Sequence, residues 1–153
     1  MKNLAIGLVV FCSLVMASGA AWSANIPAIP PNGTLTDTNT GLVWLQNANC
    51  FGLKTFVEAN VAAMSLKAGS CGLTDGSTVG PNGVGKWRLP TKDELIARQK
   101  NLQGFNSVQL FYWSGSDYPG MVYYVWAVSM DGTIVDKRHK GDNSWVWPVR
   151  SGL

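Results

Sequence analysis

The chain has 153 residues, a formal net charge of +3 and only 14% charged residues. It contains 17 glycines and 7 tryptophans, a composition typical of a compact, loop-rich, aromatic-rich domain rather than of a helical bundle. The net charge is too small to indicate a nucleic-acid-binding protein, so any basic function must be local.

The N-terminus has the pattern of a secretory signal peptide over residues 1–24. Lys2 is the only charge before Asp37, an apolar run follows over Leu4–Met16, and small residues come next. A charged start, a short apolar core and a small-residue cleavage zone are typical of a signal peptide, and the apolar run is too short for an ordinary membrane span. An uncleaved anchor is the alternative. We therefore expect an exported protein, periplasmic or extracellular at the cell surface, that meets the membrane only through this transient segment.

Two cysteines remain after cleavage, Cys50 and Cys71. An exported chain with two cysteines most simply forms one disulfide, and a reactive free pair is the alternative. They lack the C-x-x-C spacing of redox motifs and have no histidine nearby. The sequence therefore predicts a disulfide, no metal site and no cofactor.

The first predicted elements follow a Pro-rich lead over residues 25–32. Residues 33–44 read as a β-hairpin, with Leu35 and Leu42–Trp44 in its strands and turn-forming residues over 37–41. Thr55 and Glu58 then have the spacing of a capping box at the start of a helix that ends before Gly69. One face of this helix is apolar and is formed by Phe56, Ala59, Ala63 and Leu66. A glycine-rich loop over residues 72–85 comes next.

The segment KWRLPTKDEL predicts a strand-to-helix junction. Trp87–Leu89 form a short strand, and Pro90 keeps its predecessor out of helical geometry. Thr91 and Glu94 form a second capping box, for a short helix that ends near Asn101. A catalytic role for these two polar residues is the alternative. Arg88 lies between two apolar residues, so we expect it to be partly buried against a carboxylate in a structural role.

The C-terminal third is rich in strand signals. Asp131-Gly132 is typical of a two-residue hairpin turn, and residues 138–144 read as a loop. Alternation in the last strand places Trp145 and Trp147 on one face and Val146 on the other, and Pro148 indicates a sheet edge or the end of pairing. We expect strands at residues 111–116, 121–130, 133–137 and 145–150.

Several motifs in this order resemble the Lcl C-terminal domain family, a bacterial exported domain. They are TDTNTGLVWLQNANC, GKWRLPTKDEL, YWSGS, VWAV and WVWPVRSG. The resemblance implies an α+β domain of the C-type-lectin-like fold over residues 33–153, with two short helices followed by an irregular antiparallel sheet with long loops. The motif residues expected to be structural are Trp87, Arg88, Pro90, Thr91, Glu94, Trp113, Trp147 and Arg150.

The resemblance also implies a function. In the collagen-like adhesin that gives the family its name, the domain binds sulfated polysaccharides and helps the chain trimerise. Collagen repeats are absent here, which leaves the oligomeric state open. The signatures of calcium-dependent lectins are also absent, so calcium-dependent sugar binding is not expected. Formylglycine-generating enzymes share the wider fold but need a C-terminal cysteine pair, and no cysteine follows Cys71.

The predicted binding site is the segment DKRHKGDNSW. Arginine can bind sulfate or carboxylate bidentately, lysine supplies point charge, and tryptophan can stack on a sugar face. An ordinary solvated hairpin tip is the alternative. The expected ligand-binding residues are Lys137, Arg138, His139, Lys140, Asp142, Asn143 and Trp145. The remaining aromatic residues are expected to be mostly core, with one or two facing a groove: Tyr112, Trp113, Tyr123, Tyr124, Trp126 and Trp147.

These observations together predict an exported, non-enzymatic binding domain whose ligand is an anionic surface or matrix polysaccharide. A protein-binding receptor and a structural envelope module of the same fold are the alternatives. A receptor for proteins would expose a broad aromatic patch rather than a basic one. Nucleic acid is not an expected partner.

Overall fold

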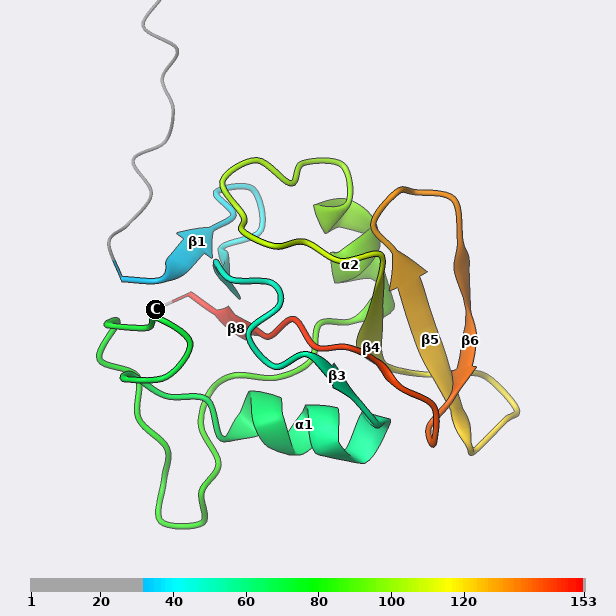
Figure 1. The fold of residues 1–153 in the computed structure, drawn as a ribbon, viewed down its shortest axis with the longest axis horizontal. Helices are drawn as coiled ribbons and strands as arrows, with labels where there is room; N and C mark the ends of the chain where they lie inside the picture. The colour runs from blue at the N-terminus through cyan, green and yellow to red at the C-terminus, as the bar shows by residue number, and fades with distance from the viewer. Residues whose placement is uncertain (1–31, 153) are drawn as a thin grey trace, which may run out of the picture.

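The computed structural model describes residues 32–152 (Figure 1). The predicted signal peptide and nearly all of the predicted Pro-rich lead lie outside these residues. The described chain forms two helices and two sheets, which is an α+β architecture, as predicted. The elements are β1 (Thr34–Thr36), β2 (Leu42–Leu45), β3 (Leu53–Lys54), α1 (Phe56–Met64), α2 (Lys92–Arg98), β4 (Phe111–Asp117), β5 (Tyr124–Ser129), β6 (Val135–His139), β7 (Ser144–Trp145) and β8 (Val149–Ser151).

The strands form a three-stranded sheet and a five-stranded sheet. The first has the order β1-β2-β8, so that the beginning and the end of the described chain pair with each other. The second has the order β3-β7-β4-β5-β6. Its β4–β7 pair is parallel and its other pairs are antiparallel, so the expectation of an antiparallel sheet holds for all but one pair. The sequence did not predict β3, a two-residue strand that pairs only with β7.

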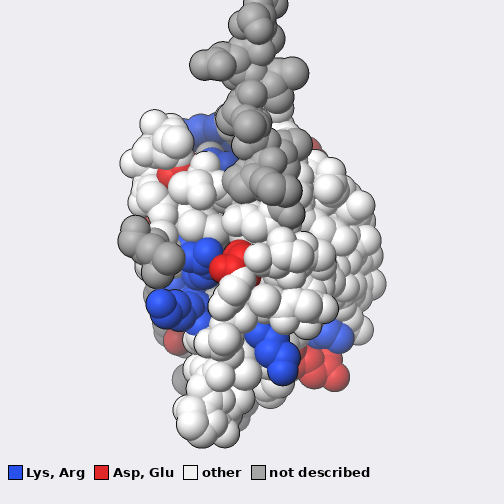
Figure 2. Space-filling model, turned by 90° about the vertical axis from the view of Figure 1, so that its left-hand side faces the viewer, with Lys and Arg blue, Asp and Glu red and all other residues white. Residues whose placement is uncertain are grey.

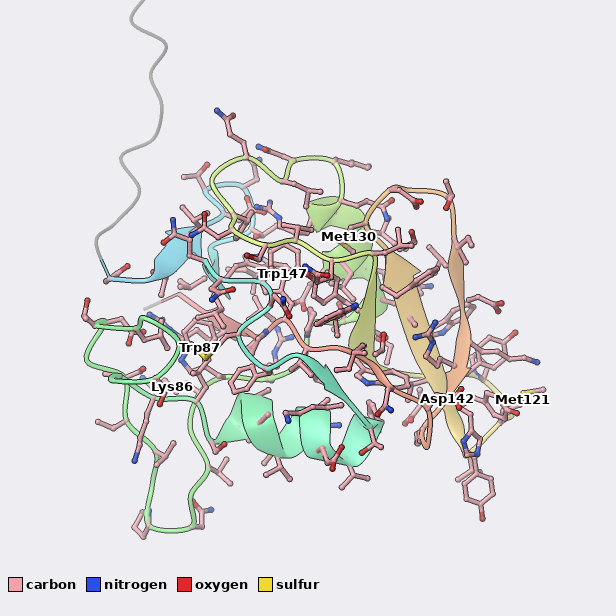
Figure 3. All side chains as sticks on the ribbon, viewed as in Figure 1. Lys86, Trp87, Met121, Met130, Asp142 and Trp147 are labelled. Carbon is pink, nitrogen blue, oxygen red and sulfur yellow. A yellow bond between two sulfur atoms is a disulfide. The ribbon has the colours of Figure 1, made fainter. Side chains whose placement is uncertain are left out.

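Two apolar clusters form the core. The larger one lies between the two sheets and contains Trp44, Tyr112 and Trp147, with Trp147 near the centre of the molecule (Figure 3). The smaller one lies under α1 and contains Trp113 and Val146. Trp147 and Val146 therefore face different clusters, as their alternation predicted, and Trp145 packs against the larger cluster. The indole N–H of Trp147 donates to the Leu45 carbonyl at 2.7 Å and that of Trp113 to the Lys54 carbonyl at 2.7 Å, so both buried donors are satisfied.

Both helices begin where the sequence predicted. The Glu58 carboxylate accepts a hydrogen bond from the Thr55 backbone N–H at 2.9 Å, and Glu94 accepts from that of Thr91 at 2.7 Å. Both helices end earlier than predicted. α1 stops at Met64 because Ser65 takes the C-cap position, and its hydroxyl donates to the Val61 carbonyl. α2 stops at Arg98.

The junction before α2 is held by an ion pair. The Arg88 guanidinium binds both oxygens of Glu94, each at 2.8 Å, which confirms the predicted partly buried arginine–carboxylate pair. The predicted strand at Trp87–Leu89 is reduced to a single bridge between Arg88 and Val149. Burial alone would raise the pKa of Glu94, but hydrogen bonds from Arg88 and Thr91 outweigh burial and lower it.

The β5–β6 hairpin differs from its prediction. The turn is not the two-residue type, because β5 ends at Ser129 and β6 begins at Val135. The Asp131 carboxylate organises the longer turn by accepting hydrogen bonds from the Ser129 and Thr133 hydroxyls and the Thr133 backbone N–H. At its other end, β6 extends to His139, which pairs with Tyr124. Two residues predicted to lie in the loop, Arg138 and His139, therefore belong to a strand.

The predicted disulfide between Cys50 and Cys71 is present, with the two Cα atoms 5.6 Å apart. It joins the segment after β2 to the long loop after α1, and both cysteines pack against the larger core cluster. At Gly33, which has a φ of +76°, an added Cβ would lie 2.4 Å from the Gly72 carbonyl oxygen. Only glycine allows the start of β1 to approach the disulfide loop this closely.

Candidate functional site

Alternation along β5 sends aromatic side chains to the outer face of the five-stranded sheet. Val125 and Ala127 are buried, whereas Tyr124 and Trp126 are partly exposed on the opposite face. The partner strand β6 adds cationic and imidazole side chains there, because Lys137 pairs with Trp126 and His139 with Tyr124. Tyr118 and Lys92 complete this surface. We call it the cation–aromatic ladder, and it consists of Lys92, Tyr118, Tyr124, Trp126, Lys137 and His139.

Lys137 lies at the centre of the ladder. Its ammonium nitrogen is 5.5 Å from the ring centre of Tyr118, 5.6 Å from that of Tyr124 and 3.5 Å from the Met121 sulfur. Within residues 32–152 it has no carboxylate partner. Aromatic rings attract the charge without neutralising it. The ammonium group is therefore held in place and remains available to an anion.

Lys92 occupies the other end of the ladder. It is the first residue of α2, and its backbone N–H donates to the Ser116 hydroxyl at 3.0 Å, which ties the helix to β4. Its ammonium lies 5.0 Å from the ring centre of Trp126, and this ring packs on Tyr118 at 4.5 Å. Its nearest carboxylate is Asp93 at 3.5 Å, a solvent-exposed partner that contributes little.

His139 closes the ladder beside Tyr124, with ring centres 5.3 Å apart. Its Nδ1 atom accepts a hydrogen bond from the backbone N–H of Gly141 at 3.1 Å. A neutral imidazole that accepts at Nδ1 carries its proton on Nε2, so His139 presents a donor to solvent.

The other predicted site residues have structural contacts. Arg138 projects from β6 on the opposite side from Lys137, donates to the Asn143 carbonyl at 3.0 Å and lies over the ring of Phe111. Lys140 pairs with Asp117 at 3.0 Å and lies over the ring of Phe56. Both side chains thus anchor the loop between β6 and β7.

Asp142 and Trp145 are also less suited than Lys137 to bind an anionic ligand. The Asp142 backbone N–H donates to the His139 carbonyl at 2.9 Å, and its exposed side chain brings negative charge to the loop. Trp145 is half-buried against the core, which leaves only part of its ring accessible. Of the seven predicted ligand-binding residues, only Lys137 and His139 belong to the cation–aromatic ladder.

The loop between β4 and β5 forms an apolar tip beside the ladder. Val122 is 81% exposed, Tyr123 71% and Met121 39%. Met121 lies at the same end of the molecule as Asp142 (Figure 3). A shallow hollow lies along this tip, lined by residues 117–122 and Lys140.

Four of the six members of the ladder were not among the predicted ligand-binding residues: Lys92, Tyr118, Tyr124 and Trp126. Alternation in Tyr124-Val125-Trp126-Ala127 is a signal that could have identified the two aromatic residues of β5 as surface residues. No local signal identifies Tyr118 or Lys92, since the first lies in a loop and the second starts a helix far away in the sequence. The packing of α2 on the five-stranded sheet brings Lys92 to this face, and the β4–β5 hairpin brings Tyr118, whose backbone N–H donates to the Tyr124 carbonyl at 3.1 Å.

The opposite side of the molecule also carries basic residues. Figure 3 places Lys86 on the side that faces the viewer in Figure 2, where basic side chains lie beside a small acidic patch. A hollow of about 150 Å³ there is lined by Lys86, Arg150 and Asp75 among others. Arg150 is bound to Asp75 at 3.3 Å, and both side chains are almost fully buried. This arginine is therefore already neutralised.

Neither metal-binding clusters nor membrane spans are found in the described part of the chain. Between residues 32 and 152, no three His, Cys, Asp or Glu side chains are grouped so that they could hold a metal ion. No helix within the same range has the length and apolar character needed to cross a bilayer.

The comparison with known proteins identifies the family. No curated protein matches the chain significantly. Residues 33–150 match the family described as the Lcl C-terminal domain. This match covers most of the chain, including both sheets, the disulfide and the cation–aromatic ladder. The chain therefore belongs to the Lcl C-terminal domain family.

Proposed function

We propose that the protein is an exported, non-enzymatic binding domain that recognises anionic polysaccharide through the cation–aromatic ladder. The observation that carries the proposal is the position of Lys137, which is exposed, fixed by two tyrosine rings and unpaired with any described carboxylate. A sulfate or carboxylate group can form a charge-assisted hydrogen bond with this ammonium.

The rest of the ladder supports a polymeric ligand. Lys92 supplies a second ammonium, and His139 supplies a donor at Nε2. Tyr118, Tyr124 and Trp126 expose only part of their surface, so we expect ring edges and hydroxyl groups rather than open ring faces to contact the sugar. Several weak contacts along one chain add up through multivalency.

The family supports the same proposal. The adhesin that this chain resembles binds sulfated polysaccharides through its domain of this family. The C-type-lectin-like fold is proposed on the same ground, and the pairing of the N-terminal strand β2 with the last strand β8 agrees with it. Export is proposed from the N-terminal sequence pattern and agrees with the Cys50–Cys71 disulfide, which is typical of oxidising compartments.

Binding of dextran sulfate to the purified protein tests the proposal, with unsulfated dextran as the matched polymer. We expect salt-sensitive binding that is weakened at least several-fold in a Lys92→Gln/Lys137→Gln variant. A Lys67→Gln/Lys86→Gln variant removes the same amount of charge from exposed positions outside the ladder and serves as the control. Equal losses in both variants would assign binding to general charge instead of the ladder, and an absence of binding would refute the proposal.

A protein ligand is the second candidate, favoured by the apolar tip of the β4–β5 loop. Val122 and Tyr123 are among the most exposed apolar side chains of the described chain. Exposed aromatic and aliphatic groups of this kind are typical of protein-binding surfaces. A Val122→Ser/Tyr123→Ser variant that keeps dextran sulfate binding but loses a partner protein would support this candidate.

A further inference from the structure

A third hollow lies at the other end of α2 from the ladder residue Lys92. It has a volume of about 520 Å³ and separates the β1–β2 turn from the loop that follows α2. Figure 1 shows these two segments on the same side of the molecule, at the top of the view. We call this hollow the turn groove. It is lined by residues 35–40, by Ala97, Arg98, Lys100 and Asn101, and by Gln103 and Phe105.

A buried ion pair holds the turn groove in shape. The Arg98 guanidinium binds Asp37 at 2.7 Å, and the two side chains are only 12% and 10% exposed. Arg98 also lies over the rings of Trp44 and Phe105. The second carboxylate oxygen of Asp37 accepts a hydrogen bond from the backbone N–H of Asn39 at 2.9 Å. The pair therefore fixes the turn against α2 without a ligand.

The rim of the groove presents many unused hydrogen-bonding groups. Within residues 32–152, the side chains of Thr36, Thr38, Asn39 and Gln103 form no hydrogen bond, although they line one hollow. Asn101 uses its amide oxygen to accept from the Gln103 backbone N–H, which leaves its amide NH₂ available. Hydroxyl and amide groups donate and accept, so together they match a ligand with both functions.

The groove carries little net charge, so charge is not the main feature that a ligand would recognise there. Asp37 neutralises Arg98, and Lys100 is the one lining cation without a carboxylate partner among the described residues. Phe105 and Leu35 add a small apolar wall, against which the C–H face of a sugar ring can pack. The lining is thus mostly uncharged and polar, with one aromatic group, whereas the ladder is cationic.

We propose that the turn groove binds an uncharged, hydroxyl-rich saccharide. This site is separate from the ladder and does not depend on the anionic-polysaccharide function proposed above. A protein with both sites could bind a polysaccharide that carries neutral and acidic sugars, or two different polymers.

Titration of the purified protein with neutral saccharides tests this proposal. The probes are dextran, galactomannan and mixed-linkage β-glucan, each as short oligosaccharides, and dextran sulfate is the probe for the ladder. Thr38→Trp fills the groove from an exposed turn position, and Asn39→Ala/Gln103→Ala removes two unused amides. At least one neutral probe is expected to bind, with at least a tenfold loss of affinity in Thr38→Trp and a smaller loss in the double variant.

The ladder variant Lys92→Gln/Lys137→Gln separates the two proposals. It should keep neutral-saccharide binding while losing dextran sulfate binding, and the groove variants should show the reverse. Thermal melts confirm that each variant is folded. The turn-groove proposal is overturned if no neutral probe binds the unmodified protein, or if the folded Thr38→Trp variant binds as tightly as the unmodified protein.

Discussion

Arg150 and Lys137 lie on different sides of the molecule, and each places its charge over an aromatic ring. The distances are nearly equal, 5.3 Å from Arg150 to the ring of Trp87 and 5.5 Å from Lys137 to that of Tyr118. Arg150 is 12% exposed and is bound to Asp75, whose side chain is 2% exposed. Lys137 is exposed and has no carboxylate partner within residues 32–152.

A ring contact therefore does not separate a structural cation from one that is available to a ligand. The paired carboxylate and the degree of burial separate them, because a neutralised and buried charge cannot recruit an anion. Arg88 is an intermediate case: Glu94 binds it with two hydrogen bonds, but its side chain is still 43% exposed. These three residues predict a graded series of mutational effects on stability.

The largest effect is expected from Asp75→Ala. The variant leaves the Arg150 guanidinium buried and unpaired, which should lower the free energy of unfolding by about 3–5 kcal/mol. Guanidinium chloride denaturation measures the loss, with Asp142→Ala as the control for removal of an exposed carboxylate. A loss below about 1 kcal/mol would show that Arg150 is solvated, and its contrast with Lys137 would disappear.

The second-largest loss of stability is expected from removal of the disulfide. It closes a loop with a sequence separation of 21 between Cys50 and Cys71, so Cys50→Ser/Cys71→Ser should cost about 3 kcal/mol in the chain-entropy picture. The oxidised and reduced forms of the unmodified protein provide a matched comparison in the same denaturation assay. Equal stability of these two forms would contradict the prediction.

Acid should reduce the contribution of the paired carboxylates Asp75 and Glu94 to the stability of the fold. Burial alone would raise the pKa of Asp75, but hydrogen bonds from Ser77 and Arg150 outweigh it and lower the pKa; the pKa of Glu94 is lowered in the same way by Arg88 and Thr91. Because both pKa values are depressed in the folded state, their stabilisation is complete above about pH 5. It is lost as the pH falls through the ordinary values of about 4 toward the lowered ones.

Melting temperatures between pH 5 and pH 3 measure this effect. We expect a decline of several degrees in the unmodified protein and a shallower decline in Glu94→Gln, which no longer titrates at this position. The same slope in both proteins would show that the Arg88–Glu94 pair contributes nothing to acid sensitivity.

Local signals predicted much of the fold. The hairpin over residues 33–44 and the two capping boxes depend on residues close in sequence, and all three are present. The two-residue strand β3 was not predictable, because it exists only through its pairing with β7, about 90 residues later. The β5–β6 turn was mispredicted because the Asp131 side chain bonds to its neighbours and stabilises a longer turn than its Asp-Gly sequence indicated.

The site was less predictable than the fold. The sequence identified a cluster of four consecutive polar residues at 137–140, but strand alternation sends Lys137 and Arg138 to opposite faces. Such a cluster cannot form one surface once it lies on a strand. Lys92 approaches Trp126 only through the packing of α2 on the sheet, which the sequence does not encode locally.

Loss of the second helix cap should have a smaller effect than loss of the buried partners. The Thr91 hydroxyl accepts a hydrogen bond from the Glu94 backbone N–H at 3.2 Å at an exposed position, so Thr91→Ala should cost about 1 kcal/mol. Thr91→Ser keeps the cap and should lose only a few tenths. An unchanged thermal melt in Thr91→Ala would count against the capping role of this residue.

The smallest effect on stability is expected from Lys137→Gln, because its ammonium has no carboxylate partner and the side chain is exposed. The free energy of unfolding should change by no more than about 0.5 kcal/mol. Its affinity for dextran sulfate should nevertheless fall by about fivefold, which corresponds to the loss of about 1 kcal/mol from one ion pair. A residue that stabilised only the fold would show the opposite behaviour. Arg150→Gln provides that opposite case, since it should destabilise the domain while binding per folded molecule stays unchanged.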